Sequence, residues 1–252
     1  MLTHPTIEKL HTLHLTGMAR ALEAQRYVPD SDTLSFEEHL GLLLDAESTE
    51  RDNRRLQTRL RTAALRSTAC LEDIDYRHHR GLDKSLMKKL ATGQWLHEHL
   101  NVLITGPSGI GKSWLACALA HQACRQGFTA RYLRLPRLLT ELAIARGDGR
   151  YRKLLAQLAR LDVIILDDFG LAALTEEQRR DLLEILEDRY ERRCTVVTSQ
   201  YPVEHWHDLI GDPTLADAIL DRLVHNAYRL NLKGESMRKR ARSLTDTEST
   251  RL

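Results

Sequence analysis

The sequence has no apolar run that approaches the roughly 18 to 20 residues needed to span a bilayer. Its N-terminus mixes charged residues with apolar ones, unlike an export signal. We therefore expect a cytoplasmic protein that does not enter a membrane. Positive and negative side chains nearly balance, with a net charge of +2 over 252 residues. Any attraction to nucleic acid must therefore come from local patches.

Cysteine is scarce, and its spacing matches no metal or redox motif. The chain has four cysteines, and none of them forms a Cys-x-x-Cys pair. Cys117 and Cys124 lie in a segment expected to be helical, at a spacing that suits reduced thiols buried as small core residues. We therefore expect the cysteines to contribute to packing and not to chemistry.

The first seventy residues have the periodicity of helices. Apolar residues recur at helical spacing from Thr6 to Tyr27, and Pro29 ends this pattern, which predicts one amphipathic helix. Ser35 and Glu38 form a capping box, in which each side chain can bond the backbone N–H of the other, and this predicts the start of a second helix. We expect residues 1–69 to form a small all-helical domain that interacts with a partner or with DNA.

The end of this helical part is strongly basic. Residues 51–70 contain six arginines and one acid, Asp52, and so carry a net charge of +5. Such a stretch is ordinarily a solvated helix face. Arginines spaced along a helix can also follow the phosphate backbone of DNA without reading its sequence, and both interpretations stay open.

From residue 70 to residue 252 the pattern changes to that of an α/β domain. Apolar runs of strand length alternate with amphipathic segments of helix length, which predicts a parallel sheet flanked by helices. The clearest helix is expected over residues 175–193, because Thr175 and Gln178 form a second capping box. Five strands are expected, over residues 101–105, 129–135, 162–167, 194–199 and 227–232.

A phosphate-binding loop follows the first of these strands. Residues 106–113 read Gly-Pro-Ser-Gly-Ile-Gly-Lys-Ser, and a helical run comes directly after them. Glycines let such a loop point its N–H groups at phosphate oxygens, at a helix N-terminus that itself favours anions. Lys112 would reach the β- and γ-phosphates of ATP, and the Ser113 hydroxyl would bind Mg²⁺. The expected nucleotide-binding residues are Gly106, Pro107, Ser108, Gly109, Ile110, Gly111, Lys112, Ser113 and Trp114.

A pair of acids at the end of a buried strand supplies the second half of a magnesium site. Four apolar residues precede Asp167 and Asp168, and the carboxyl ends of parallel strands are where such sheets bind ligands. We expect Asp167 to hold Mg²⁺ and Asp168 to orient or deprotonate the attacking water. The sequence therefore predicts a chain that binds ATP with Mg²⁺ and hydrolyses it.

The chain resembles the AAA+ ATPases, in particular the branch that holds DnaC-like helicase loaders and IstB-like transposition helper proteins. Besides the phosphate loop and the acid pair, the resemblance rests on residues 94–96 (Gln-Trp-Leu), on the run from Gly211 to Leu223, and on residues 233–238 (Lys-Gly-Glu-Ser-Met-Arg). It covers the α/β part, whereas the helical N-terminal part matches in size and position alone. It implies a five-stranded AAA+ sheet, and a homo-oligomer that binds double-stranded DNA, hydrolyses ATP and assists a transposase.

The resemblance also assigns roles to single residues. Ser199, beside Thr198, falls on a polar sensor that positions the lytic water. Arg222 falls on an arginine finger, a cation that enters the ATP site of the adjacent subunit. Asp168 stands where most AAA+ proteins have Glu, and this shorter side chain implies slow basal hydrolysis.

The C-terminal end departs from the AAA+ pattern. Arg238 falls on a second sensor arginine, with Lys239 as a rival, yet about twenty residues after the last expected strand are too few for the helical lid that usually carries this residue. We therefore expect little or no C-terminal lid.

Three other functions remain open. A helicase loader would share every ATPase residue and differ in its partner, which the N-terminal part would select. A P-loop kinase for a small molecule would need an acceptor pocket and no arginine from a neighbour. A nucleotide switch would bind ATP with negligible turnover.

Overall fold

A computed structural model describes residues 5–25, 34–78 and 80–237 of the chain. The chain divides into two compact units, Met1–Thr58 and Arg59–Leu252. The division falls within one long helix, α3 (Phe36–Ala63). In the described ranges no helix is both long and apolar enough to cross a membrane. The predicted domain boundary at residues 69 and 70 stays a prediction about independent folding.

The first unit holds α1 (Pro5–Thr12), α2 (Thr16–Gln25) and most of α3. The single helix predicted from Thr6 was wrong, because the chain leaves the helical path at His14, whose φ of 58° is left-handed. Glu47 of α3 secures the start of α2, since its Oε2 accepts from Gly17 N at 2.8 Å and from Met18 N at 3.2 Å. A negative charge at a helix N-terminus is stabilising.

The predicted start of α3 is confirmed. Ser35 N donates to Glu38 Oε2 at 2.7 Å, and Glu38 N donates to Ser35 Oγ at 3.3 Å, so both halves of the capping box form. The helix runs for 28 residues from Phe36.

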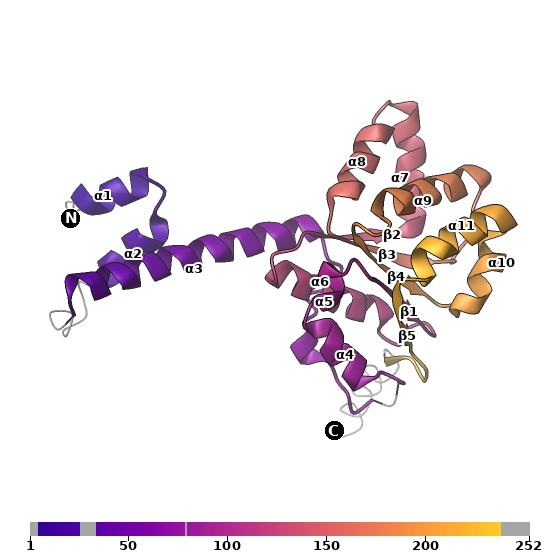
Figure 1. Ribbon diagram of the computed structural model, residues 1–252, viewed down its shortest axis with the longest axis horizontal. Helices are drawn as coiled ribbons and strands as arrows, with labels where there is room; N and C mark the ends of the chain where they lie inside the picture. Colours follow the sequence, from indigo (N-terminus) through magenta and orange to yellow (C-terminus); the bar gives the residue numbers. More distant parts are fainter. Residues whose placement is uncertain (1–4, 26–33, 79, 238–252) are drawn as a thin grey trace, which may run out of the picture. The chain divides into compact units, whose positions relative to one another are not determined.

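The second unit is built on a parallel sheet with the strand order β2-β3-β4-β1-β5 (Figure 1). Two of the five predicted strands have the bounds expected, and the other three differ by one or two residues at one or both ends. The α/β fold class is thereby confirmed. The strands are β1 (Asn101–Thr105), β2 (Ala130–Arg134), β3 (Val163–Phe169), β4 (Cys194–Ser199) and β5 (Ala227–Asn231).

Helices cover both faces of this sheet, so its central strands are apolar on both sides. Thr175 caps α9 and forms the predicted capping box with Gln178, but the helix ends at Arg189 and not at residue 193. The helices are α4 (Lys84–Ala91), α5 (Gln94–His97), α6 (Lys112–Arg125), α7 (Leu135–Gly147), α8 (Tyr151–Arg160), α9 (Glu176–Arg189), α10 (Trp206–Ile210) and α11 (Pro213–Val224), with short 3-10 turns η2 (Leu71–Asp73) and η3 (Val203–His205).

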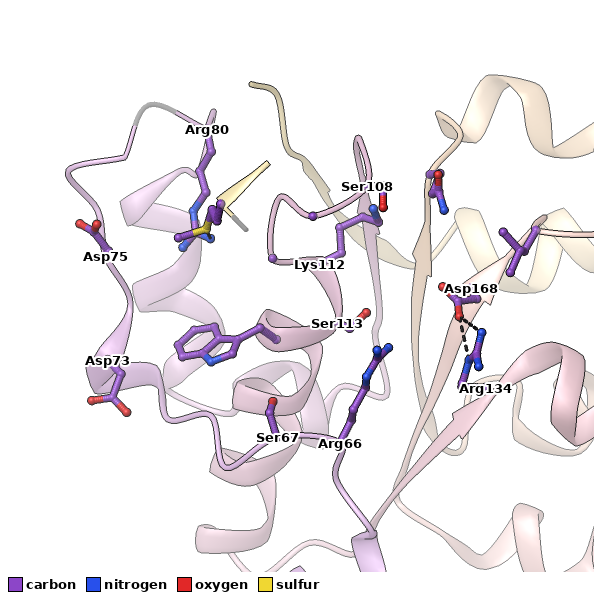
Figure 2. Close-up of a pocket in the computed structure, with 16 residues that line it drawn as sticks. Arg66, Ser67, Asp73, Asp75, Arg80, Ser108, Lys112, Ser113, Arg134 and Asp168 are labelled. Atoms are coloured by element: carbon purple, nitrogen blue, oxygen red, sulfur yellow. Dashed lines mark hydrogen bonds and ion pairs between the residues drawn. The ribbon is translucent and has the colours of Figure 1, made fainter. Parts of the chain in front are cut away.

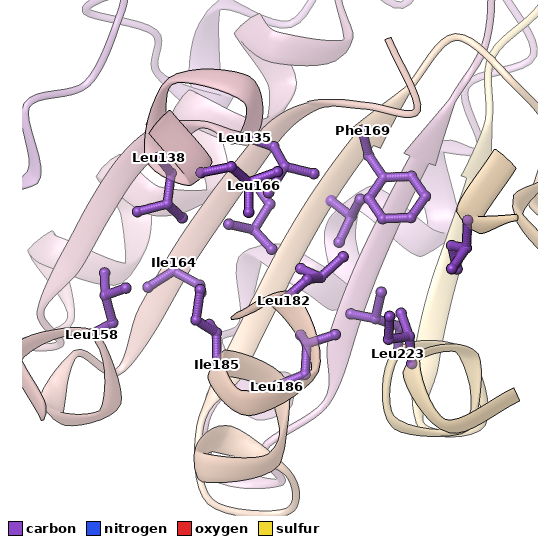
Figure 3. Packing of buried hydrophobic residues seen from close by; sticks show 14 of the residues in the cluster. Leu135, Leu138, Leu158, Ile164, Leu166, Phe169, Leu182, Ile185, Leu186 and Leu223 are labelled. Atoms are coloured by element: carbon purple, nitrogen blue, oxygen red, sulfur yellow. The ribbon is translucent and has the colours of Figure 1, made fainter. Parts of the chain in front are cut away.

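The main core lies between the sheet and the layer of α7, α8, α9, α10 and α11 (Figure 3). Ile164 and Leu166 of β3 face Leu182 and Ile185 of α9 in this cluster, and all four side chains are buried. On the opposite face, α6 packs against β1, β2, β3 and β4. This packing fixes the carboxyl ends of β1, β3 and β4 beside the first turn of α6.

A buried arginine ties the far end of α9 to the sheet. Arg189 is 1% exposed, and its Nη1 donates to the carbonyls of Leu158 at 2.6 Å and Leu161 at 2.8 Å. Its Nη2 donates to the carbonyls of Cys194 at 2.6 Å and Asp162 at 3.3 Å. Because burial disfavours its charge, the pKa of Arg189 falls to about 10.

Candidate functional site

The predicted phosphate loop, residues 106–113, joins β1 to α6. It begins at Gly106, whose φ of 143° suits glycine alone, and a Cβ there would lie 2.3 Å from the carbonyl oxygen of Leu232. Gly106 N donates to Ser199 O of β4 at 3.2 Å, and Leu232 N donates to Thr105 O at 2.8 Å. The start of the loop is therefore held between β4 and the residue that follows β5.

Lys112 and Ser113 stand at the N-terminus of α6, where the helix dipole favours an anion. Lys112 is 9% exposed, and its Nζ donates to the carbonyls of Gly106 at 2.7 Å and Pro107 at 2.8 Å, so its ammonium lies over the loop. Ser113 Oγ donates to Asp167 Oδ1 at 2.7 Å. The two sequence motifs thus meet, although 54 positions separate their residues.

Asp167 is fully buried at the end of β3 and is surrounded by donors. Besides Ser113, the hydroxyls of Thr198 and Tyr132 donate to its carboxylate, and Arg66 Nη1 lies 3.6 Å from its Oδ2. Burial and the adjacent carboxylate raise the pKa of Tyr132, so this phenol is a neutral donor. A serine hydroxyl and a carboxylate are the oxygen ligands that Mg²⁺ prefers, so Ser113 and Asp167 fit a magnesium ion.

Asp168 occupies an irregular position that turns it toward an edge strand. Its φ is 66°, and the pairing of β3 with β4 shifts register between Leu166 and Phe169. Arg134 of β2 contacts Asp168 Oδ2 through Nε and Nη2, each at 2.9 Å (Figure 2). The carboxylate expected to act on water is therefore held by an arginine of the neighbouring strand.

Lys112, Ser113, Asp168 and Arg134 line a cavity of about 700 Å³, a volume in the range of small-molecule sites. Asp168 and Arg134 lie on one side of the phosphate loop, and Asp73, Asp75 and Arg80 lie on the other (Figure 2). This volume is sufficient for a nucleoside triphosphate next to the phosphate loop.

The wall opposite the acid pair contains a buried cation. Arg80 is 2% exposed, and its Nη1 donates to Ile110 O at 3.2 Å and contacts Met237 Sδ at 3.3 Å. Its Nε has no hydrogen-bond partner among the described residues, and burial lowers the pKa of this guanidinium. Met237 N donates to Gly109 O at 3.0 Å and Lys233 N to Arg80 O at 2.9 Å, so residues 232–237 lie along the loop.

Two predicted residues, Ser199 and Arg222, have other surroundings, and a third is not described. Ser199 is buried, donates to Phe169 O at 2.8 Å and accepts from Tyr201 N at 3.1 Å, whereas its neighbour Gln200 lines the cavity. Arg222 of α11 pairs with Glu187 and donates to Ala218 O at 2.9 Å, away from the cavity of its own chain. Arg238 lies outside the described residues. The roles of all three stay predictions.

Four residues that the sequence did not assign to the nucleotide site complete the cavity, namely Arg66, Arg80, Arg134 and Gln200. Arg66 belongs to the basic stretch that the sequence offered as a solvated helix face or a DNA contact, and no motif surrounds the other three. Arg134 could have been found from register, because it pairs with Asp167 across β2 and β3. Gln200 could have been found because it directly follows the strand that carries Ser199.

A family of known proteins shares the pattern of this chain. The model of the family described as IstB-like ATP binding protein matches residues 8–245. The chain belongs to this IstB-like family. The match extends over both compact units, including the helical part in which the resemblance was weakest.

Named relatives of this IstB-like protein come from bacterial insertion sequences. It is 56% identical over 242 residues to the insertion sequence ATP-binding protein y4pL of Sinorhizobium fredii, which covers 96% of this chain and 99% of the relative. It is 35% identical over 205 residues to the ATP-binding protein of insertion sequence IS21 from Pseudomonas aeruginosa, with 81% of this chain and 77% of the relative covered.

Solved structures agree on the fold. A crystal structure of DnaI superposes with a TM-score of 0.57 at 21% identity and covers 66% of this chain and 91% of its own. The DnaC helicase loader superposes with a TM-score of 0.53 at 20% identity and covers 66% of this chain and 97% of its own. At this identity the likeness establishes the fold, and the predicted AAA+ sheet of the DnaC type is confirmed.

Proposed function

We propose that this IstB-like protein is a Mg²⁺-dependent ATPase that assembles on double-stranded DNA and assists a transposase. The hydrogen bond of 2.7 Å between Ser113 and Asp167 carries the enzymatic part, because it brings a magnesium-binding hydroxyl and carboxylate together beside a phosphate loop. The names of the relatives, which are ATP-binding proteins of insertion sequences, support the biological part.

The chain's residues divide the work of hydrolysis. Loop N–H groups and Lys112 bind the phosphates, while Ser113 and Asp167 hold Mg²⁺, which neutralises charge on the phosphate oxygens when it is bound. Asp168 orients a water molecule and accepts its proton as the water oxygen bonds to the γ-phosphorus. The bond between that phosphorus and the β–γ bridging oxygen breaks, which leaves ADP and phosphate.

We propose that a neighbouring subunit supplies a further cation to the γ-phosphate, in addition to the cations of the chain's own cavity. Arg222 lies on α11 with 24% of its side chain exposed, so it can reach another copy. Because the Ser199 hydroxyl donates to Phe169 O, we propose that Gln200, which directly follows Ser199 and lines the cavity, supplies the polar group that positions the water. Arg238 would contact the nucleotide from the C-terminal segment.

For DNA, we propose backbone contacts by the basic stretch of residues 51–66. Arg55 and Arg61 are exposed there, and each phosphate contact by an arginine releases counterions. Removing either one should weaken binding to every duplex alike and flatten its dependence on salt.

The helicase-loader alternative shares the same ATPase residues, and likeness to DnaI and DnaC does not favour it beyond the fold. A pull-down with the full chain separates the two partners. Retention of the transposase encoded by the same insertion sequence, without retention of a replicative helicase, supports our proposal.

The enzymatic proposal is tested by Asp168→Asn. This variant should bind Mg²⁺–ATP like the wild type but release phosphate about 100-fold more slowly, because the amide cannot take a proton. Asp208→Asn, which removes an exposed acid of α10, is the matched control. Normal phosphate release by Asp168→Asn would exclude Asp168 from this role, and transfer of the γ-phosphate to a metabolite instead of water would favour a kinase.

A further inference from the structure

Arg66 enters the nucleotide cavity from the segment that follows α3. Its side chain is 51% exposed, lines the cavity with Ser113 and Asp168, and places Nη1 at 3.6 Å from Asp167 Oδ2. Figure 2 shows its guanidinium between the helix that carries Ser113 and the strand that carries Asp168. An arginine thus lies beside the carboxylate expected to hold Mg²⁺.

The backbone around Arg66 is fixed to the ATPase unit on both sides. Before it, Arg59 Nε donates to Cys124 O of α6 at 2.9 Å, and Arg131 Nη1 of β2 donates to Thr62 O at 3.3 Å. After it, Ala69 is buried and packs with Cys117 of α6. The half-exposed guanidinium can therefore change partners, while its backbone stays at the cavity.

Asp167 cannot keep all its neighbours when the nucleotide arrives. A carboxylate offers about four lone-pair positions, and here Ser113 and Thr198 donate to Oδ1 while Tyr132 and Arg66 lie at Oδ2. A dication held by Ser113 and Asp167 repels a guanidinium on the same carboxylate. Arg66 is the neighbour that yields, because it makes the longest contact and its side chain is the most exposed.

ATP brings a new partner for the displaced cation. Its terminal phosphate would face the acid pair, and Arg66 lines the same cavity as Ser113 and Asp168. Guanidinium groups pair with phosphate oxygens through two parallel hydrogen bonds, a geometry that lysine cannot reproduce. ADP lacks this phosphate and leaves the guanidinium without such a partner.

We propose that Arg66 is a nucleotide-sensing residue, which exchanges the carboxylate of Asp167 for the terminal phosphate of Mg²⁺–ATP and so distinguishes ATP from ADP. This inference rests on the proposed function, because it needs the phosphate loop and the acid pair to bind Mg²⁺–ATP. The exchange takes place three residues after the end of α3, so it links the state of the nucleotide to the basic helix.

The test measures affinity and not turnover. Calorimetry on the full chain with Mg²⁺ compares a non-hydrolysable ATP analogue with ADP for the wild type, Arg66→Gln, Arg66→Lys and the control Arg152→Gln, which removes an equal charge from the exposed surface of α8. Arg66→Gln should lower the preference for the ATP analogue about tenfold and leave ADP affinity unchanged. Arg66→Lys should restore part of the preference, and Arg152→Gln should match the wild type.

Amide exchange of residues 59–69 supplies a second readout. In the wild type these amides should exchange more slowly with the ATP analogue than with ADP, and Arg66→Gln should abolish the difference. An unchanged affinity ratio in Arg66→Gln would overturn the inference, and so would an equal loss of both nucleotides. If the wild type binds neither nucleotide, the proposed function fails as well, whereas binding by the wild type with no effect of Arg66→Gln removes Arg66 alone.

Discussion

Replacing Gly106 by alanine should show how strongly ATP binding depends on the geometry of the phosphate loop. A control substitution at another glycine with a positive φ accounts for the backbone strain. The new Cβ would lie 2.3 Å from Leu232 O, and ordinary contact needs at least about 3.4 Å, so the loop and the end of β5 must part by about 1 Å. The φ of 143° adds about 1–3 kcal/mol of backbone strain. A misplacement of about 1 Å can cost about 100-fold in function, so we expect ATP affinity to fall between about 10- and 100-fold.

Gly127→Ala is the control for this prediction. Gly127 follows α6 with a φ of 99°, and a Cβ there meets nothing within 4 Å. It should lose about 1–2 kcal/mol of unfolding free energy from strain and bind ATP normally. Calorimetric titration with Mg²⁺–ATP, together with urea unfolding followed by tryptophan emission, reports both quantities, because Trp95, Trp114 and Trp206 all belong to the second unit.

Binding of ATP by Gly106→Ala as tight as that by Gly127→Ala would refute this prediction. That result would mean that the contact with Leu232 O is not needed for the binding geometry of the loop. A loss of stability without a loss of affinity would lead to the same conclusion.

Three further outcomes are expected. Arg189→Met should lower the free energy of unfolding of the second unit by about 3–5 kcal/mol in urea, because four carbonyls lose a charged donor. The control Arg192→Met, at an exposed position, should change this free energy by less than about 0.5 kcal/mol. Equal effects of the two substitutions would contradict this prediction. Arg222→Ala should abolish phosphate release by the assembled protein and keep ATP affinity, and mixing it with Asp168→Asn should restore some activity; no restoration would argue against a finger from a neighbour. At pH 8, iodoacetamide should modify half-buried Cys70 before the three buried cysteines. Burial raises the pKa of the Cys124 thiol to about 11 and that of the Cys194 thiol to about 12, and it also raises the pKa of Cys117. Equal rates of modification would contradict this prediction.

The sequence predicted those parts of the fold that local patterns determine. The strand before Gly106 and the strand before Asp167 are apolar runs followed by motif residues, and both lie where they were expected. Each capping box needs two side chains three positions apart, so Thr175 and Ser35 were readable as helix starts. The break at His14 could not be predicted, because apolar periodicity does not reveal that a residue other than glycine adopts the left-handed conformation.

The missing parts of the site come from register and from distant contacts. Arg134 meets Asp168 because β2 pairs with β3 and an irregularity turns Asp168 aside, which no pattern within one segment encodes. Arg66 meets Asp167 across about a hundred positions of sequence. Ser199 is buried as the last residue of β4, whereas Gln200, which follows the strand, lines the cavity, and apolar periodicity does not distinguish the two positions.

The position of β1 in the sheet has a consequence for how occupancy can be measured. All five residues of this strand are buried, it pairs with β4 and β5, and the phosphate loop extends directly from it. The loop's anchor cannot loosen alone, so melting of the sheet and loss of the binding site should coincide. A nucleotide at about 100 times its dissociation constant would add about 2.7 kcal/mol to the folded state, which corresponds to a rise of roughly 5–10 °C in melting temperature. A simple thermal-shift assay on the unlabelled protein is therefore enough to rank nucleotides and divalent ions.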